Sequence, residues 1–260
     1  MKIDDLSAVI LTYNEEENIE RVLLKLKWLK KVYVVDSYST DKTHELCLNH
    51  SNVTYLTRKF DNHASQWNYG LEFVTTPWVL TLDADYVLDD DWEEEWRKLD
   101  VQHQGYLVSF RYIINDRPLS SALYPSKVVL FQKEHGTFIQ DGHTQRLLLK
   151  GTVGRFPAKI SHDDRKKLVR WLSNQVKYAD LESDKILSNA QLTKIDKIRK
   201  NAWLMPILIV PYCLIIIGLL FDGKRGWIYT LQRLVAETLI SLMILEKKSN
   251  EEKQCKDIRS

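Results

Sequence analysis

The first 36 residues carry a strand–helix–strand pattern that restricts the fold more than any other stretch. Residues 6–12 form a short apolar run, and apolar residues from Ile19 to Leu26 then recur at the spacing of one helical face. A second apolar run, residues 32–35, ends on Asp36. Two strands joined by a helix within about thirty residues predict a right-handed parallel βαβ unit, and therefore an α/β fold.

The same alternation continues through the next fifty residues or so. The pattern predicts a helix over 43–48, a strand over 53–56, a helix that follows the loop 62–70 and a strand over 79–82. In an open α/β sheet, ligands bind beyond the carboxyl ends of the strands. Three of these strand ends are followed by polar side chains: Asn14, Asp36 and Asp85. We therefore expect a nucleotide site at this edge, although each residue could instead cap a helix.

The strand over 79–82 stops on Asp83-Ala84-Asp85. Two carboxylates at a strand end are hard oxygen ligands, which suit Mg²⁺ or Mn²⁺, and such an ion in turn suits a diphosphate. Spacing alone is weak support, because many Asp-x-Asp pairs are ordinary loop or helix-capping carboxylates.

The ordered motifs VILTYNEEENI, VYVVDSYSTDKT, QWNYG and VLTLDAD resemble those of family-2 glycosyltransferases with the GT-A fold. The resemblance covers residues 6 to about 100. The later segments YPSKVVLF, DGHTQ and ISHDDRKKLVRWL resemble a bacterial branch that is similar to the lipopolysaccharide-core glucosyltransferases. Two positions depart from the family pattern: Tyr38 stands where Gly is common, and Tyr86 replaces a frequent Glu.

This resemblance implies roles for individual residues. Asp36 would hold the base, Asp85 would bind the metal, and Asp83 would contact the ribose or the metal. The residues that would surround the nucleotide are Thr12, Tyr13, Asn14 and Glu15, together with Ser39, Asp41, Arg58 and Asn68.

The stretch 101–195 is expected to form the acceptor half, with strands over 106–114 and 127–132. An inverting transferase needs a base for the acceptor hydroxyl, and Asp141, in the loop 141–145, is our candidate. His143 beside it is either a second catalytic residue or a structural histidine. Three further cations are either ligands for an anionic acceptor or solvated surface charges: Arg111, Arg117 and Lys127.

Residues 160–167 end a strand and begin a helix. His162 is a candidate third metal ligand, and Arg165 or Lys166 is a candidate clamp for the departing diphosphate. The alternative is a capped helix whose charges face water.

The last quarter of the chain changes character. No charged residue occurs from Ala202 to Phe221, a run long enough to span a bilayer, although Pro206 and Pro211 interrupt its helical pattern. A second apolar helix is expected over 227–245, with a polar stripe of Arg233, Glu237 and Ser241. Basic residues flank both segments, which favours a re-entrant or interfacial pair over a full span. A buried core hairpin is the alternative.

Charge, cysteine content and the position of the first strand add three expectations. The net charge of +2 gives no reason to expect nucleic-acid binding. Three cysteines far apart in the sequence indicate neither a disulfide framework nor a metal cluster, as in a reducing compartment. A strand that begins by Ala8 would leave no room for a cleavable signal peptide.

We therefore expect a GT-A, Rossmann-like domain over 1–195, with a nucleotide-binding half, 1–100, and an acceptor half, 101–195. Membrane-associating helices and a polar tail would follow over 196–260. The expected function is inverting transfer of a hexose from a nucleotide-sugar donor, such as a UDP-sugar, to a lipid-linked or lipopolysaccharide-type glycan. The enzyme would work at the cytoplasmic side of the cell membrane, with Mg²⁺ or Mn²⁺. The alternatives are a polyprenyl-phosphate sugar transferase and a non-catalytic sugar-nucleotide-binding subunit of an assembly complex.

Overall fold

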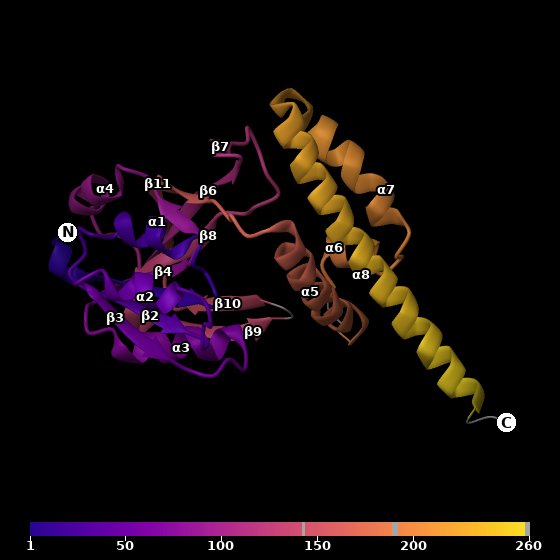
Figure 1. The fold of residues 1–260 in the computed structure, drawn as a ribbon, viewed down its shortest axis with the longest axis horizontal. Helices are drawn as coiled ribbons and strands as arrows, with labels where there is room; N and C mark the ends of the chain where they lie inside the picture. Colours follow the sequence, from indigo (N-terminus) through magenta and orange to yellow (C-terminus); the bar gives the residue numbers. More distant parts are fainter. Residues whose placement is uncertain (142–143, 189–191, 258–260) are drawn as a thin grey trace. The chain divides into compact units, whose positions relative to one another are not determined.

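The computed structural model describes residues 1–141, 144–188 and 192–257 (Figure 1). The chain forms two compact units. The first comprises Met1–Pro118 and Leu123–Lys166, and the second comprises Leu119–Ala122 and Lys167–Ser260. The sequence analysis drew the boundary near residue 195, whereas contacts group the helix α5 (Leu168–Ser188) with the C-terminal helices. The reason is that Ala179 and Ile186 of α5 are buried against Ile240 and Ile244.

The first unit alternates strands and helices over its first hundred residues, as predicted. A short 3₁₀ turn (Ile3–Asp5) precedes the first strand. The strands and helices that follow are β1 (Leu6–Thr12), α1 (Ile19–Leu24), β2 (Val32–Asp36), α2 (Thr43–Leu48), β3 (Val53–Thr57), α3 (His63–Phe73), β4 (Trp78–Asp83), β5 (Tyr86–Leu88) and α4 (Trp92–Lys98). The later strands are β6 (Gly105–Ile114), β7 (Arg117–Pro118), β8 (Lys127–Gln132), β9 (Gly136–Asp141), β10 (Thr144–Leu149) and β11 (Val153–His162).

The main sheet has the strand order β3-β2-β1-β4-β8-β6-β11-β5, with β7 paired to β6. Its first four strands are parallel, and the register pairs Thr12 of β1 with Asp36 of β2 and Leu11 with Asp83 of β4. The carboxyl ends of β1, β2 and β4 therefore meet at one edge, as the sequence predicted. The strands β9 and β10 form a separate hairpin beside α3.

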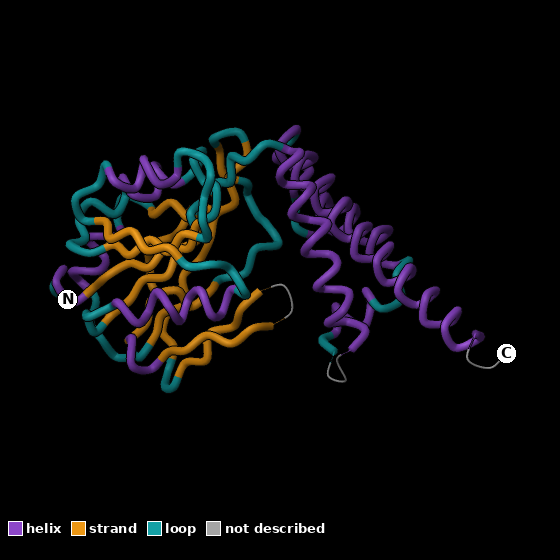
Figure 2. The backbone as a smooth tube through the Cα atoms, turned by 60° about the horizontal axis from the view of Figure 1, so that its bottom comes forward, coloured by secondary structure: helices purple, strands orange, loops and turns teal. Residues whose placement is uncertain are grey.

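Both faces of β1, β2 and β4 are buried. Ala8 and Ile10 of β1 lie in the core cluster that includes residues of α1, α2 and α4, whereas Val9 lies in the cluster with α3. This alternation follows from the two-residue period of a strand and explains why these strands read as continuous apolar runs. Figure 2 shows the strands between helices.

The sheet curls back on itself. Tyr86 of β5 follows Asp83 of β4 by three residues, which span at most about 11 Å. In a flat sheet with this strand order, β5 would lie about 19 Å from β4, given about 4.8 Å between neighbouring strands. The antiparallel pairing of β5 with β11, which sets His162 opposite Tyr86, therefore brings the end of β11 to the end of β4.

The second unit contains α5, α6 (Lys194–Arg199), α7 (Leu204–Pro211) and α8 (Lys224–Asp257). Pro206 was expected to interrupt the helix, but it lies in the first turn of α7, where a missing N–H costs little. The helix therefore does not break at Pro206. After Pro211 the chain continues as a π-helical turn (Tyr212–Ile216), and Gly218, with φ +81°, ends the helical run. The apolar run 202–221 is therefore not one continuous helix.

Of the described residues, one helical stretch, Lys224–Glu251 of α8, is long and apolar enough to cross a membrane by length and composition. In the polar stripe predicted on this helix, Glu237 and Ser241 are buried and Arg233 is half-buried. Glu237, 1% exposed, accepts hydrogen bonds from the Arg199 guanidinium of α6 at 2.6 and 2.9 Å and from Arg233 at 3.1 Å. The stripe thus serves packing among the helices of this unit.

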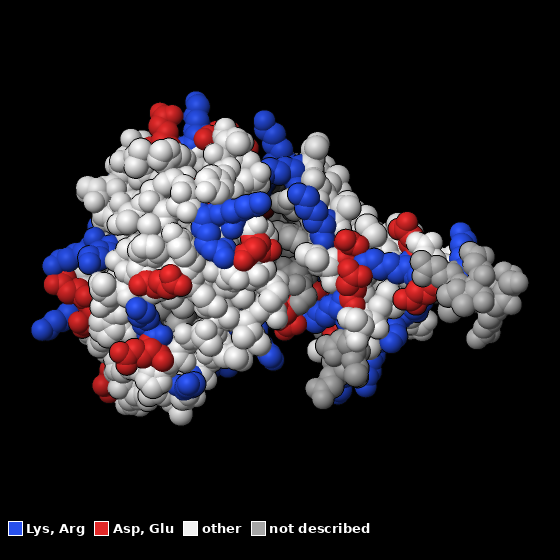
Figure 3. Space-filling view, turned by 90° about the horizontal axis from the view of Figure 1, so that it is seen from below, with Lys and Arg blue, Asp and Glu red and all other residues white. Residues whose placement is uncertain are grey.

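Charge is evenly mixed on the face of the molecule in Figure 3, where basic and acidic side chains are interspersed. This agrees with the net charge of +2. Cys47 and Cys213 are buried free thiols.

Candidate active site

Hydrogen bonds join the loops that follow β1 and β2. The backbone N–H of Asn14 donates to Ser39 Oγ at 2.7 Å, and Asn14 Oδ1 accepts from the Thr40 N–H at 2.7 Å. The Glu15 N–H donates to Thr43 Oγ1 at 2.7 Å. Asn14 adopts φ 53°, a left-handed conformation that asparagine tolerates better than most residues. The two loops thus form one hydrogen-bonded rim at the strand ends, which we call the nucleotide rim.

Asp36 lies at the base of this rim and is 1% exposed. Its carboxylate accepts hydrogen bonds from the backbone N–H of Ser39 at 2.7 Å and from the Ser39 hydroxyl. Tyr38 adopts φ 63°, a conformation that explains why Gly is common here in the family that the sequence resembles. Beside Asp36, the Thr12 hydroxyl is buried and has no hydrogen-bond partner in the part of the chain that the structure describes. Such an atom is available to a ligand.

Arg58 and Asp41 also lie at this rim. Asp41 accepts from the Glu16 N–H at 3.2 Å. Arg58 donates to Asp61 at 2.7 and 2.9 Å and to Gln66 at 2.6 Å. Gln66, which the sequence analysis did not single out, is buried and links Arg58 to Ser37 of the β2 loop.

Asn68 does not join this group. Its side-chain amide donates to the Phe138 carbonyl and accepts from the Phe138 N–H, both at 2.9 Å. It therefore joins α3 to β9 in the manner of a neighbouring strand. No local pattern in the sequence indicates this partner.

Asp85 and His162 meet at the curl of the sheet. His162 Nε2 lies 3.3 Å from Asp85 Oδ2, and Lys166 Nζ lies 3.6 Å from the same oxygen. Burial disfavours the charged carboxylate, but His162 and Lys166 outweigh this effect and hold the pKa of Asp85 well below its usual range. The other oxygen of Asp85, Oδ1, is buried without a partner among the described residues, as is His162 Nδ1.

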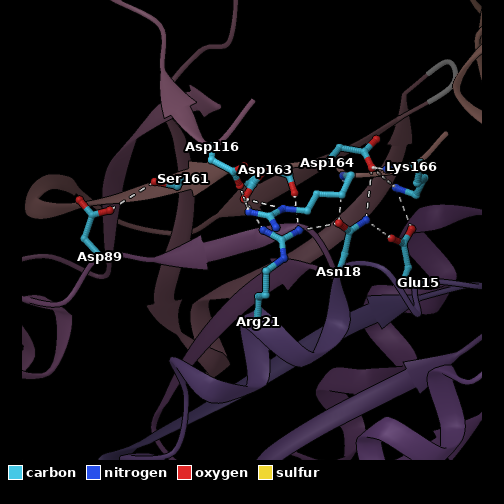
Figure 4. A network of polar contacts seen from close by, with 10 residues as sticks. Glu15, Asn18, Arg21, Asp89, Asp116, Ser161, Asp163, Asp164 and Lys166 are labelled. Carbon is cyan, nitrogen blue, oxygen red and sulfur yellow. Dashed lines mark hydrogen bonds and ion pairs between the residues drawn. The ribbon is translucent and has the colours of Figure 1, made fainter. Parts of the chain in front are cut away.

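Lys166 is the cation at the centre of the group. Its ammonium lies 2.9 Å from Glu15 and 3.2 Å from Asp164, and its side chain is 9% exposed (Figure 4). Burial lowers the pKa of Lys166, but Asp85, Glu15 and Asp164 outweigh burial and raise it, so the amine stays charged. Burial likewise raises the pKa of Glu15 to about 7, against the opposing effect of Lys166.

Arg165 lies outside this centre. It pairs with Asp116 and with Asp163, the latter at 3.1 Å. Asp163 also pairs with Arg21 of α1. Of the two cations considered as a diphosphate clamp, Lys166 rather than Arg165 therefore contacts the carboxylate at the strand end.

The residues at this edge suit a divalent metal that is completed by substrate. Asp85 offers one buried oxygen that has no partner among the described residues, and Asp83, two residues earlier, is the last residue of β4. Among the described residues, no set of three or more His, Cys, Asp or Glu side chains is arranged as a preformed metal site. Mg²⁺ commonly binds through one or two carboxylates, waters and substrate phosphates, so this sparse donor set fits it better than a closed cage would. Asp85 and His162, which lie together, would hold the ion, and Asp83 at the end of β4 is the further predicted ligand.

The expected base, Asp141, ends β9 and pairs across the hairpin with Thr144 of β10. Gln140 beside it accepts from the Ala64 N–H at 3.3 Å, which ties the hairpin to the start of α3. His143 lies outside the described residues.

A family comparison decides the class of this protein. Residues 7–155, more than half of the chain, match the model described as glycosyl transferase family 2. The chain belongs to this family. The resemblance inferred from its motifs is confirmed. This family 2 glycosyltransferase is 31% identical over 88 residues to the lipopolysaccharide core biosynthesis glycosyltransferase LpsC of Rhizobium meliloti. That match covers 32% of this chain and about a third (33%) of LpsC.

Solved structures agree with the GT-A fold. The glycosyltransferase resembles the mannosyltransferase PcManGT of Pyrobaculum calidifontis, in complex with GDP-Man and Mn²⁺, with a TM-score of 0.54 and 16% identity over 92% of this chain and 87% of that one. It also resembles S. aureus TarS 1–349 in complex with UDP-GlcNAc, with a TM-score of 0.50 and 14% identity over 95% and 92% of the two chains. At these identities the likeness concerns the fold.

Proposed function

We propose that this family 2 glycosyltransferase transfers a hexose from a UDP-sugar to a lipid-linked or lipopolysaccharide-type glycan, with inversion, at the cytoplasmic face of the cell membrane. The observation that carries the proposal is the convergence of Asp36, Asp85 and Lys166 at one edge of the sheet. Similar proteins support the donor and acceptor classes, because TarS was solved with UDP-GlcNAc and LpsC is a glycosyltransferase of lipopolysaccharide core biosynthesis.

In this proposal Asp36 accepts a hydrogen bond from the base, and the rim of Thr12, Asn14 and Ser39 surrounds the nucleoside. Bound Mg²⁺ or Mn²⁺ at Asp85 would neutralise charge on the leaving diphosphate. Lys166, held charged by its carboxylate neighbours, stabilises the same developing charge. Asp141 takes the proton of the acceptor hydroxyl as that oxygen attacks the anomeric carbon.

Membrane docking is supported by exposed apolar side chains in the second unit. Several of them are two-thirds or more exposed: Trp203, Ile207, Ile215, Ile216 and Phe221. Exposed large apolar groups in such number are unusual for a surface that faces only water. The basic residues Lys194, Lys197, Lys200 and Lys224 are also exposed nearby in the sequence, as anionic headgroups would require.

An interfacial position fits the packing of α8 better than a full span. Lys247 of α8 pairs with Asp180 at 2.7 Å and with Asp184 at 2.6 Å, both on α5. A bilayer that enclosed the whole of Lys224–Glu251 would also enclose these charges, which is costly. We therefore place the apolar surface in one leaflet.

A screen of nucleotide sugars tests the proposed function. The purified chain, with Mg²⁺ or Mn²⁺, is expected to hydrolyse one UDP-hexose slowly and to transfer its sugar to a membrane extract that contains glycolipid. Transfer to polyprenyl phosphate would favour the polyprenyl-phosphate sugar transferase. Binding of a UDP-sugar without any turnover would favour a non-catalytic subunit, and absence of binding to every nucleotide sugar would contradict the proposal.

A further inference from the structure

A second polar cluster lies beside His162. Lys127, the first residue of β8, donates hydrogen bonds to the hydroxyls of Tyr86 at 2.8 Å and Tyr124 at 3.0 Å, and these two hydroxyls bond to each other. The Lys127 ammonium lies 4.7 Å from the centre of the Tyr124 ring and 5.4 Å from that of Tyr86. We refer to Lys127, Tyr86 and Tyr124 as the lysine–tyrosine cluster.

Lys127 differs in its partners from Arg21 and Lys166, two other cations of the first unit that are mostly buried. Arg21 and Lys166 pair with carboxylates, whereas Lys127 forms no ion pair with any carboxylate of the described residues. Its hydrogen-bond partners are neutral hydroxyls and its other close contacts are aromatic faces, which stabilise a cation only partly. Placing a charge in such surroundings costs free energy unless an anion completes the site.

The hydrogen-bond inventory of the lysine–tyrosine cluster shows surplus donors. An ammonium has three N–H groups, and two of those on Lys127 are used by the tyrosines. The two hydroxyls have two O–H groups, and one is used in the bond between them. One N–H and one O–H therefore remain for an acceptor. Lys127 and Tyr124 are partly exposed, so a ligand can reach them.

The cluster is continuous with the candidate active site. The Tyr124 ring lies 4.6 Å from the His162 ring, and His162 contacts Asp85 at 3.3 Å. In the sheet, β8 and β6 lie on the side of β4 opposite to β1 and β2. The nucleotide rim is on the β1 and β2 side, so a donor that extends across Asp85 would bring its sugar toward the cluster.

We propose that Lys127, Tyr86 and Tyr124 form a subsite for an anionic group, a phosphate or a carboxylate, carried by the acceptor glycan. This inference rests on the proposed function for the existence of a glycan acceptor. The anion accepts hydrogen bonds from the ammonium and from one tyrosine hydroxyl, while the aromatic rings pack against the sugar that carries it. The subsite holds the acceptor next to the sugar to be transferred, and so selects charged acceptors over neutral ones.

Calorimetric titration of the full chain, saturated with UDP and Mg²⁺, tests this subsite. The probes are glucose 6-phosphate, glucuronate, inorganic phosphate and glucose. We expect at least one anionic sugar to bind more tightly than glucose and than inorganic phosphate. In Lys127→Gln its affinity should fall at least about tenfold, and in Tyr124→Phe by a smaller factor, because a charge-assisted hydrogen bond is the stronger one. Lys159→Gln, which removes an exposed lysine from β11, is the matched control and should bind like the wild type.

UDP affinity, measured first in each variant, separates this inference from the proposed function. The UDP affinity of Lys127→Gln should stay within about twofold of the wild type, since the nucleotide rim lies on the other side of β4. Retained UDP affinity also shows that the variant is folded. Unchanged binding of anionic sugars in Lys127→Gln would overturn the subsite. Wild-type binding that is no tighter for the anionic sugars than for glucose would also overturn the subsite. Equal affinity for inorganic phosphate and glucose 6-phosphate would overturn the assignment of the subsite to a glycan. If the wild type binds no UDP, the proposed function fails, and the same titration without UDP still tests Lys127.

Discussion

Lys166 Nζ lies 2.9 Å from Glu15 Oε1, so a residue that follows the last strand of the sheet pairs with one that follows the first. The pair therefore joins the beginning and the end of the first unit's sequence at the candidate active site. It also sets the Lys166 ammonium 3.6 Å from Asp85, where the leaving diphosphate is expected.

Replacing Lys166 should therefore affect chemistry more than replacing its neighbour. Lys166→Met is expected to lower the rate of sugar transfer about a hundredfold, because one electrostatic contact to the leaving group is lost. Arg165→Gln should lower it far less, since Arg165 pairs with Asp116 and Asp163 instead. Steady-state transfer rates measure both variants, and equal losses would remove Lys166 from its proposed role.

Asp141→Asn keeps the size of the side chain and removes its ability to accept a proton. Turnover should fall about 10²–10⁴-fold, with UDP affinity unchanged. Near-normal turnover would show that another group serves as the base, such as Asp164 or a phosphate of the acceptor. In the latter case the polyprenyl-phosphate alternative gains support.

Asn68→Ala tests whether Asn68 serves the fold or the nucleotide. The substitution leaves both backbone groups of Phe138 without their partner, so the free energy of unfolding should fall by about 1–3 kcal/mol. Thermal denaturation measures this change. UDP affinity at a temperature where the variant is folded should match that of the wild type, and a large loss of affinity without loss of stability would instead indicate a nucleotide contact.

Exposed apolar residues of the second unit should govern membrane binding. Flotation with vesicles of phosphatidylethanolamine and phosphatidylglycerol is expected to recover the wild type with the lipid. The double variant Ile215→Asp/Phe221→Asp should partition at least about a hundredfold less, because each side chain contributes roughly 1.5–3 kcal/mol when buried. Leu48→Asp, at an exposed leucine of α2, is the control. Equal flotation of the double variant and the wild type would contradict the docking surface.

Local sequence patterns predicted the parallel half of this protein well. Each of β1, β2 and β4 is an apolar run that stops on a polar residue, so both the strand and the site at its end could be predicted from a few adjacent residues. The parallel register then brings Asp36 and Asp85 to one edge without further information.

Contacts between distant segments were not predictable in the same way. The pairing of His162 with Asp85 depends on the curl that sets β5 against β11, and the sequence analysis could only name His162 as a candidate ligand. Asn68 resembles a loop residue of the nucleotide site in its motif, yet its amide binds the backbone of β9. In the last quarter of the chain, Pro206 and Pro211 were expected to interrupt the helix, whereas the helical run ends at Gly218.

The central claim is that Asp85 holds a metal ion that binds the donor diphosphate. Calorimetric titration of UDP into the full chain, with Mn²⁺ and then with a chelator, tests this claim most directly. The titration is repeated with Asp85→Asn. Asp100→Asn is the control for loss of an exposed carboxylate. We predict that removal of the metal weakens UDP binding by about tenfold or more in the wild type and in the control. Asp85→Asn with Mn²⁺ should bind UDP as weakly as the wild type with chelator. UDP binding that is equally tight with and without chelator, in both the wild type and Asp85→Asn, would contradict this account.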